Sequence, residues 1–284
     1  MVRLMTTTTE LKLERAQEKK PVGFVPTMGN LHQGHISLLK TALQNFEVVY
    51  FSIFVNPKQF GPKEDFNQYP RTLENDLQLI EACASDYPQR QVIVFSPKDI
   101  TEIFPEQSEQ SIYVSGLSQM LEGAIRPGHF EGVATVVYRL FELVKPKKAY
   151  FGLKDYQQYL VIRQMVKDLQ LPIEVIGMPI IRDDSGLARS SRNQYLSLEQ
   201  KQSALILSRT LKQVQEKING LKANLPAAQS FIQTQIQDAN WNYLELRDAD
   251  SLSTDLSQSK TITLLGVYQL GSTRLLDNLQ VELT

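Results

Sequence analysis

Cysteine and histidine are scarce in this sequence, and their scarcity bears on disulfide and metal chemistry. The chain has one cysteine, Cys83, so it cannot form an internal disulfide. Its three histidines are His32, His35 and His129. A metal site at the His32 and His35 pair would need His129 or Cys83 as a further nitrogen or sulfur ligand. Nothing in the sequence brings either residue close, so a metal centre is the weaker interpretation of the pair.

Long apolar runs and an excess of one charge are also missing. No apolar run approaches the about 20 residues that cross a bilayer. The 30 basic and 31 acidic residues give a net charge of -1, which predicts no general attraction to nucleic acid or anionic membranes. The run from Thr6 to Thr9 stands where a secretory signal would be apolar, and we expect it to be a frayed terminus. These absences favour a soluble, cytoplasmic protein that acts on small molecules.

The first part of the chain alternates short β-branched and aromatic segments with longer amphipathic ones. The pattern predicts strands at 22–25, 48–55, 92–95, 149–151 and 173–176, and helices at 36–44, 72–84, 133–144 and 156–169. Strands and helices that alternate in this way build parallel sheets covered by helices. We therefore expect an α/β, Rossmann-like, doubly wound domain over residues 1–181.

The character of the sequence changes after residue 181. A polar turn at 182–186 is followed by a helical pattern over 198–221, and strands are expected at 242–246, 261–268 and 275–276. These elements predict a smaller α+β domain over residues 182–284.

The most informative segment is 26–35, Pro-Thr-Met-Gly-Asn-Leu-His-Gln-Gly-His, between the first predicted strand and helix. Gly29 and Gly34 allow a ligand to approach the backbone, and a helix beginning near Gly34 would offer free N–H groups to an anion. The spacing fits neither the Walker pattern nor the dinucleotide fingerprint. It is similar to the His-x-Gly-His signature of nucleotidylyl transferases, which implies that His32 and His35 bind the α-phosphate. The alternative is two surface histidines at a helix start.

Three further segments follow predicted strands or lie at the domain boundary. Asn56 and Gln59 follow the second strand, and their amides could bind hydroxyl or carboxylate groups. The alternative is a common Asn-Pro turn with a solvated Gln59. After the strand at 149–151, Lys154 could reach phosphate and Asp155 a ribose, although a solvated lysine and a helix cap are the alternatives. The segment 187–193 offers two hydroxyls and two guanidinium groups for the β- and γ-phosphates, and it also suits a lid. The alternatives are a helix cap at Ser190 or Ser191 and a phosphorylation site.

A glycine-rich loop at 121–133 also carries candidate anion ligands. Arg126 and His129 lie just before a predicted helix. The alternative is an ordinary surface loop. We treat this segment as secondary.

Together these segments closely resemble the pantothenate synthetase (pantoate:beta-alanine ligase) family of the HIGH-motif nucleotidylyl transferase superfamily. The resemblance rests on 26–29 with 32–35, 54–57 with 59–60, 154–158, 190–193 and 271–278. It implies that ATP and D-pantoate form pantoyl adenylate with release of pyrophosphate, and that beta-alanine then attacks it to give pantothenate and AMP. It also implies Mg2+ with ATP and a homodimer.

The resemblance assigns roles residue by residue. The implied catalytic residues are His35, as proton donor, His32 and Lys154. The implied pantoate ligands are Gln59 and Gln158. The implied ATP ligands are Met28, Gly29, Asn30, Leu31, His32, Gln33, Gly34, His35, Gly152, Leu153, Lys154, Asp155, Ile181, Arg189, Ser190, Ser191 and Arg192. Metal ligands are not assigned.

Two residues depart from the family pattern. Arg189 stands where the family usually has Met, and Leu153 where it usually has Glu. The first change adds a positive charge beside ATP, and the second removes a carboxylate beside Lys154. The alternatives to a ligase are a nucleotidylyl transferase that stops after the first step and a non-catalytic nucleotide-binding protein. An aminoacyl-tRNA synthetase relative is disfavoured by the neutral charge.

Overall fold

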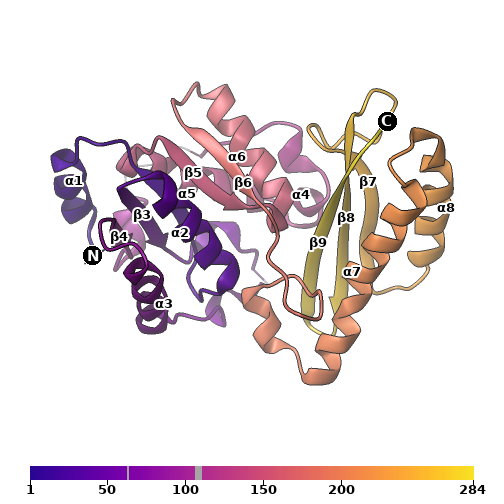
Figure 1. Ribbon diagram of the computed structural model, residues 1–284, viewed down its shortest axis with the longest axis horizontal. Helices are drawn as coiled ribbons and strands as arrows, with labels where there is room; N and C mark the ends of the chain where they lie inside the picture. The colour runs from indigo at the N-terminus through magenta and orange to yellow at the C-terminus, as the bar shows by residue number, and fades with distance from the viewer. Residues whose placement is uncertain (63, 106–110) are drawn as a thin grey trace. The chain divides into compact units, whose positions relative to one another are not determined.

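The computed structural model describes residues 1–62, 64–105 and 111–284 and divides the chain into two compact units (Figure 1). Unit 1 comprises Met1–Leu153 and Gln157–Pro179, and unit 2 comprises Lys154–Tyr156 and Ile180–Thr284. The short segment Lys154–Tyr156 therefore belongs to unit 2, although its neighbours on both sides belong to unit 1.

Unit 1 is built on a parallel sheet in the order β1-β4-β3-β2-β5-β6. Its strands are β1 (Val2–Met5), β2 (Gly23–Thr27), β3 (Val48–Ile53), β4 (Gln91–Phe95), β5 (Lys148–Gly152) and β6 (Glu174–Met178). All six residues of β3 are buried, as expected for a central strand covered by helices on both faces. The five predicted strands are confirmed, and the order, which reverses at β2, confirms the Rossmann-like doubly wound fold.

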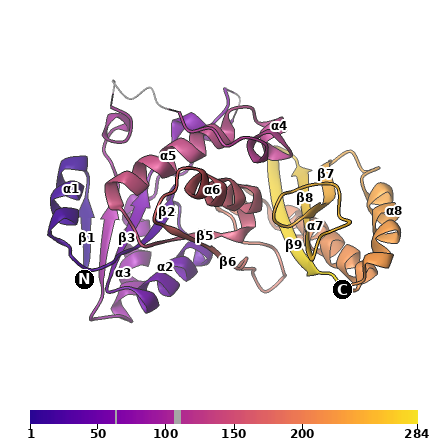
Figure 2. The same cartoon turned by 90° about the horizontal axis from the view of Figure 1, so that it is seen from above.

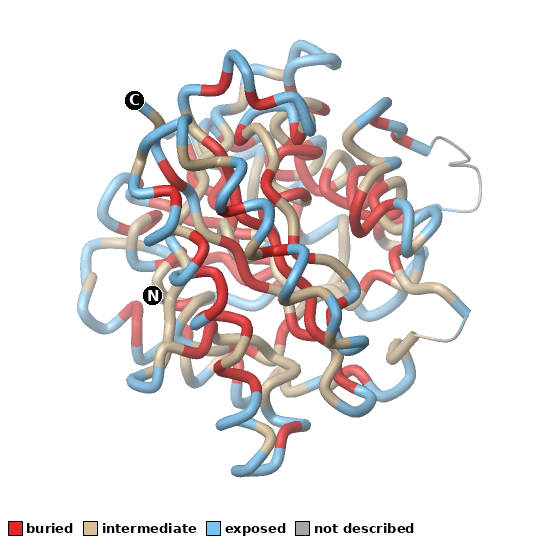
Figure 3. The backbone as a smooth tube through the Cα atoms, turned by 90° about the vertical axis from the view of Figure 1, so that its right-hand side faces the viewer, coloured by how far each residue is buried: buried red, intermediate tan, exposed pale blue. Residues whose placement is uncertain are grey.

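Helices cover both faces of this sheet, as Figure 2 shows for α2 and α3 on one side and α5 and α6 on the other. Their bounds are α1 (Thr8–Gln17), α2 (Gln33–Asn45), α3 (Leu73–Ser85), α4 (Glu122–Ile125), α5 (His129–Val144) and α6 (Tyr156–Asp168). Separate apolar clusters lie on the two faces of the sheet, one against α1, α5 and α6 and one against α2 and α3. In Figure 3 the buried positions, in red, run through the inner segments of the trace.

The N-terminal threonine run is the clearest correction to the sequence-based prediction. Thr7 is the N-cap of α1, and its side chain and that of Glu10 form reciprocal hydrogen bonds with backbone N–H groups. Thr8 also donates its hydroxyl to the carbonyl oxygen of Glu102 at 2.6 Å. The run is therefore an ordered helix start, because capping and a contact distant in sequence compensate for its poor helix propensity.

Unit 2 consists of an antiparallel sheet, β7-β8-β9, and two helices packed on it. The strands are β7 (Trp241–Asp248), β8 (Thr261–Leu270) and β9 (Thr273–Glu282), and the helices are α7 (Leu198–Ile218) and α8 (Leu225–Gln235). The predicted helix and three strands are confirmed, with β9 much longer than expected. Helix α8 lies between α7 and β7, where the sequence analysis predicted no element. Unit 2 thus has an α+β architecture.

Candidate functional site

The segment 26–35 lies at the carboxyl end of β2, where parallel sheets of this kind bind ligands. Its backbone turns sharply, because Gly29 and Asn30 both have positive φ angles, of 81° and 50°. The hydroxyl of Thr27 donates to the carbonyl oxygen of Ser52 at 2.8 Å and accepts the N–H of Gly29 at 3.2 Å. The turn is thus tied to the neighbouring strand β3.

Helix α2 begins directly after this turn, and its first turn is capped by the two histidines. Nδ1 of His32, the N-cap residue, accepts the N–H of Gly34 at 3.1 Å. Nδ1 of His35 accepts the N–H of His32 at 3.3 Å. This is a capping box in which imidazole rings replace the usual Ser or Thr and Glu.

The capping box determines which ring nitrogen carries the proton. A nitrogen that accepts a backbone N–H must present its lone pair, so neutral His32 and His35 are protonated at Nε2. The ring centroids lie 4.1 Å apart. Both rings therefore present Nε2–H, the group that can donate to a phosphate oxygen. The structure brings these two predicted catalytic residues together.

The next two amides of the turn are already used within the protein. The N–H of Asn30 donates to Oδ2 of Asp76 at 2.9 Å, and that of Leu31 donates to Oδ1 at 2.8 Å. Asp76, on α3, is fully buried. These two predicted ATP ligands therefore direct their N–H groups into the protein. No local sequence signal linked Asp76 to the turn, because the two lie more than 40 residues apart.

Gln59 lies at the end of the 3-10 helix η1 (Pro57–Gln59), which follows β3. The residue is 8% exposed. Its Oε1 accepts from Nδ2 of Asn56 at 3.1 Å, and its Nε2 donates to the sulfur of Met28 at 3.1 Å. The structure thus brings the predicted pantoate ligand Gln59 beside Met28 of the turn, and a weak thioether acceptor leaves the Nε2 donor available for exchange with a substrate oxygen.

Arg126 and His129 are not available anion ligands in this structure. Nε and Nη2 of Arg126 donate to the two carboxylate oxygens of Glu64 at 2.6 and 2.5 Å. Nη1 of Arg126 lies 3.0 Å from Nε2 of His129, whose Nδ1 lies 2.8 Å from the carbonyl oxygen of Gln59. The guanidinium can only donate and the carbonyl can only accept, so His129 carries its proton on Nδ1.

The charges of this cluster follow from its burial and contacts. Burial and the nearby Arg126 guanidinium lower the pKa of His129 to about 4. Burial works to raise the pKa of Glu64, but the hydrogen bonds and charge of Arg126 outweigh it and hold that pKa below its usual range. The Glu64, Arg126 and His129 cluster therefore supports the backbone of Gln59. The sequence suggested two of its members but missed Glu64.

Glycine at 132 allows α5 to pack directly on η1. A Cβ atom at Gly132 would lie 2.2 Å from the carbonyl oxygen of Lys58. The carbonyl oxygen of Gly132 accepts from Nδ2 of Asn56 at 3.1 Å. The end of the glycine-rich loop therefore provides close packing of backbone behind Gln59.

The carboxyl end of β5 carries Gly152 and Leu153, and it accounts for one departure from the family pattern. The Leu153 side chain occupies the space beside Gly177 of β6, where a Cβ atom would lie 2.5 Å from it. An apolar residue is thus accommodated at 153 because residue 177 has no side chain. Nearby, Gln157 is buried and donates to the carbonyl oxygens of Leu117 and Met120 at 2.7 Å, whereas Gln158 is half-buried.

Unit 2 holds the remaining predicted ligands, and it fixes the backbone of Lys154. Nδ2 of Asn278, on β9, donates to the carbonyl oxygen of Lys154 at 2.8 Å. The Lys154 ammonium lies 3.6 Å from Oδ1 of Asp155, which is exposed. Lys154 and Ser190 line the same small cavity of about 10 Å³, together with Asn193 and Asp277. This volume holds about one water molecule.

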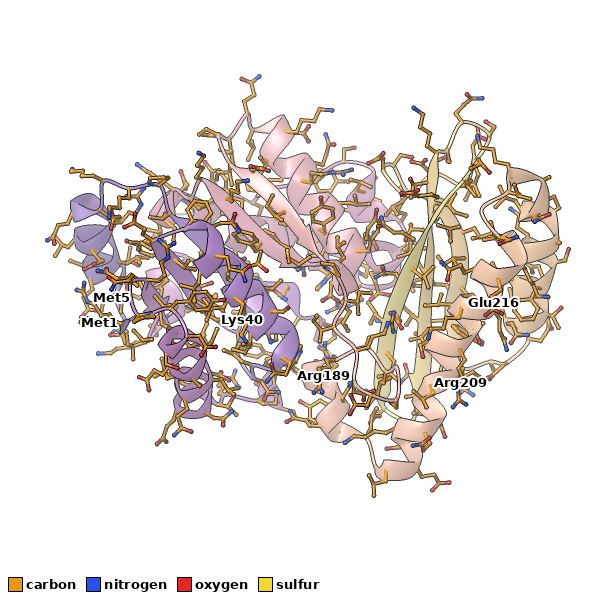
Figure 4. All side chains as sticks on the ribbon, viewed as in Figure 1. Met1, Met5, Lys40, Arg189, Arg209 and Glu216 are labelled. Atoms are coloured by element: carbon orange, nitrogen blue, oxygen red, sulfur yellow. The ribbon has the colours of Figure 1, made fainter. Side chains whose placement is uncertain are left out.

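The segment that contains Arg189 is held by a short antiparallel bridge within unit 2. The N–H of Arg189 donates to the carbonyl oxygen of Ile181 at 2.9 Å, and Arg182 pairs with Ala188. Arg189 lies in the loop before α7, where Figure 4 labels it. Ser190 caps the 3-10 helix η6 (Ser191–Tyr195) by accepting the N–H of Arg192 at 3.3 Å. Both of its flanking residues, Arg189 and Ser191, are half-buried.

An ion pair between half-buried Arg182 and buried Asp277 anchors this bridge to β9. Nη1 and Nη2 of Arg182 donate to the two oxygens of Asp277 at 2.6 and 2.8 Å. Asp277 is 4% exposed. Two parallel hydrogen bonds between a guanidinium and a carboxylate fix the relative orientation of both groups. The bridge that carries Ile181 and Arg189 is therefore attached to the strand that also holds Lys154.

Across the described ranges 1–62, 64–105 and 111–284, no group of three or more His, Cys, Asp or Glu side chains is arranged to hold a metal ion. In the same ranges, no helix combines the length and the apolar character that crossing a membrane requires.

Comparisons with known proteins agree over nearly the whole chain. Residues 2–280 match the family model of pantoate-beta-alanine ligase. The pantothenate synthetase of Acetivibrio thermocellus is 44% identical over 288 residues, which cover 99% of this chain and 100% of that protein. The crystal structure of the pantothenate synthetase from Thermus thermophilus is similar with a TM-score of 0.87 and 40% identity, over 98% of this chain and 99% of that one.

A second solved structure carries ligands. The pantoate-beta-alanine ligase of Francisella tularensis, complexed with beta-gamma ATP and beta-alanine, is similar with a TM-score of 0.76 and 32% identity, over 98% of this chain and 97% of that one. The sequence, the sheet order and these full-length similarities lead to the same conclusion. This chain belongs to the pantoate-beta-alanine ligase family.

Proposed function

We propose that this chain joins D-pantoate to beta-alanine in two steps, through a pantoyl adenylate. In the first step a carboxylate oxygen of pantoate attacks the α-phosphorus of ATP, and the bond to the bridging oxygen breaks to release pyrophosphate. In the second step the amine of beta-alanine attacks the acyl carbon and AMP leaves, while the amine gives up a proton. Mg2+ enters as the companion of ATP.

The observation that carries this proposal is the imidazole capping box. It presents two Nε2–H donors at the carboxyl end of β2. Adenylyl transfer needs donors placed where charge develops on the phosphates, and no protein nucleophile. We infer that His32 and His35 donate to the α-phosphate and to the bridging oxygen of the leaving pyrophosphate.

The remaining predicted residues divide between the substrates. We infer that the backbone of Met28, Gly29, Asn30, Leu31, Gln33 and Gly34 shapes the ATP side of the turn, and that Gln59 and Gln158 bind pantoate. Lys154 supplies a positive charge to the phosphates. The other ATP ligands that we propose are Gly152, Leu153, Asp155, Ile181, Arg189, Ser190, Ser191 and Arg192. The cationic side chains among them suit the β- and γ-phosphates.

The domain roles, the oligomeric state and the location belong to the same proposal. We propose that residues 1–181 bind the nucleotide and pantoate and that residues 182–284 form a lid. The resemblance to the family supports a homodimer in the cytoplasm. Light scattering of the purified chain tests the dimer: a mass near twice 32.3 kDa is expected, and a mass near 32.3 kDa would exclude it.

The first test measures pyrophosphate and AMP release with ATP and magnesium, as D-pantoate and then beta-alanine are added. We expect pyrophosphate release to require pantoate and AMP release to require beta-alanine. The His35→Ala variant should lose both. Pyrophosphate release without a second step would identify a transferase that stops after adenylation. Binding of ATP without any pyrophosphate release would contradict the proposal.

A further inference from the structure

We propose that Asp76 is a positioning residue that holds the turn at 26–35 in the shape its histidines require. The inference rests on the proposed function, because it assigns the turn to ATP. It concerns a residue that is buried behind the turn, and its role is to act on the turn's backbone.

The carboxylate of Asp76 accepts three hydrogen bonds, from the turn and from Thr72 at the start of α3. Oδ2 accepts the N–H of Asn30, and Oδ1 accepts the N–H of Leu31 and the hydroxyl of Thr72, the last at 3.1 Å. Asp76 lies in the first turn of α3, where the helix dipole stabilises a negative charge. Its exposed fraction is 0%. A buried carboxylate with these partners is held in one orientation.

The donors on the turn are successive residues in an unusual conformation. Gly29 and Asn30 have positive φ angles, so the N–H groups of Asn30 and Leu31 converge on one acceptor. Asp76 occupies the position that an anion would take in such a concavity. A Cβ atom on Gly29 would lie 3.0 Å from Oδ2 of Asp76, which shows how closely the carboxylate fits under the turn.

Asp76 affects the histidines through the peptide unit between Leu31 and His32. Leu31 immediately precedes His32, the N-cap of α2. Fixing the N–H of Leu31 fixes the direction in which the chain enters the cap, and the cap orients both imidazole rings. Asp76 therefore acts on the phosphate donors through the backbone, and loss of its acceptor geometry should lower kcat more than it raises KM for ATP.

Hydrogen exchange on the wild-type protein without substrates tests the geometry. We expect the amides of Asn30 and Leu31 to exchange about 100-fold more slowly than that of Gln33, the exposed first residue of α2. Equal exchange at all three positions would contradict the proposal. Since this measurement needs no activity, it separates Asp76 from the proposed function, which fails if the wild-type protein releases no pyrophosphate with pantoate.

The Asp76→Asn variant tests the consequence, because its amide group presents one acceptor oxygen where the carboxylate presents two. We expect kcat for pyrophosphate release to fall about 10- to 100-fold, exchange at Asn30 or Leu31 to accelerate about 10-fold, and the magnesium concentration for half-maximal rate to stay unchanged. Unchanged exchange and kcat would overturn the proposal. Recovery of the variant's kcat at high magnesium concentration would also overturn the proposal, because it would indicate that Asp76 is a magnesium ligand.

Two further variants keep the test decisive. Glu74→Gln removes an exposed carboxylate from the same helical turn and should change neither exchange nor kcat. If Asp76→Asn does not fold, Thr72→Val removes one donor while keeping the carboxylate. It should accelerate exchange at Leu31 and lower kcat about 2- to 5-fold, and no change in either would count against the proposal.

Discussion

The turn at 26–35 and the Glu64, Arg126 and His129 cluster use the same side chain in opposite ways. In the turn, Nδ1 of each histidine accepts a backbone N–H, so Nε2 carries the proton. In the cluster, Nδ1 of His129 donates to a carbonyl oxygen, and Nε2 accepts from Arg126. The comparison shows that the hydrogen-bond partner of one ring nitrogen determines whether the other nitrogen of a neutral histidine donates or accepts. The same residue type therefore carries its proton on Nε2 in one region, and in the other it carries it on Nδ1 and acts as an internal support.

The largest effect is expected when the donor function of the turn is broken. In His35→Asn, the side-chain oxygen can replace Nδ1 as acceptor of the His32 N–H, but nothing replaces Nε2–H. We expect the fold to be retained and kcat for pyrophosphate release to fall about 100- to 1000-fold, because a donor to developing charge is lost. Steady-state kinetics and thermal unfolding check this. Wild-type kcat would show that His35 acts only as a cap.

The second-largest effect is expected at Gly132, where α5 packs closely on η1. In Gly132→Ala the new methyl group would collide with the carbonyl oxygen of Lys58, so η1 and α5 must separate. We expect about 1–3 kcal/mol of lost stability and a raised KM for pantoate. Denaturant unfolding measures the first. The control is Gly61→Ala, whose methyl group has only ordinary contacts at 3.7 Å with Glu64. Equal effects of the two variants would contradict this explanation.

The cluster also predicts a pH dependence of stability. The pKa of His129 is about 4 in the folded state, whereas the ordinary pKa of a histidine is 6.5. Between these values the unfolded chain binds a proton that the folded chain does not, so stability should fall as pH drops from 6.5 to 4. We expect His129 to contribute about 1–3 kcal/mol to this loss. In His129→Gln this part of the dependence should disappear. If the curves of unfolding free energy against pH were parallel for the wild-type protein and the His129→Gln variant, this prediction would be wrong.

The smallest effect is expected at Arg189, which lies outside both regions. Its backbone N–H is bonded to Ile181 whatever its side chain is, so Arg189→Met should keep the reaction. Loss of the positive charge should raise KM for ATP about 2- to 5-fold, since partly exposed charges contribute little. The control is Arg209→Met on the exposed surface of α7. An unchanged KM for ATP would remove Arg189 from the proposed ATP ligands.

The sequence predicted the repeating elements well, because their signal is local. Strand β3 is apolar except for Ser52, and α5 and α6 repeat apolar residues at helical spacing. The prediction for the start of α1 was wrong, although Thr7 and Glu10 have the spacing of a capping box. That spacing is a local sequence signal that predicts the start of a helix.

The supports of the candidate site could not be predicted in the same way. Asp76, Glu64 and Asp277 each bond to residues at least 40 positions away in the sequence. A single sequence contains no periodicity that pairs them. Conversely, the pattern did single out Arg126 and His129 as charged groups in a glycine-rich loop, and it left open whether they bind a ligand. Only the three-dimensional contacts show that their charges and donors are already used.

The brief passage of the chain through unit 2 at Lys154–Tyr156 has a consequence for dissecting the protein. Within unit 2, Asn278 holds the carbonyl of Lys154, Gln280 donates to the hydroxyl of Tyr156, and that hydroxyl donates to Ala249. A fragment cut at residue 179 would keep Lys154 and Tyr156 but lose all three of these partners. We therefore expect that a chain divided at residue 179 would not keep the native structure around Lys154–Tyr156 in either fragment.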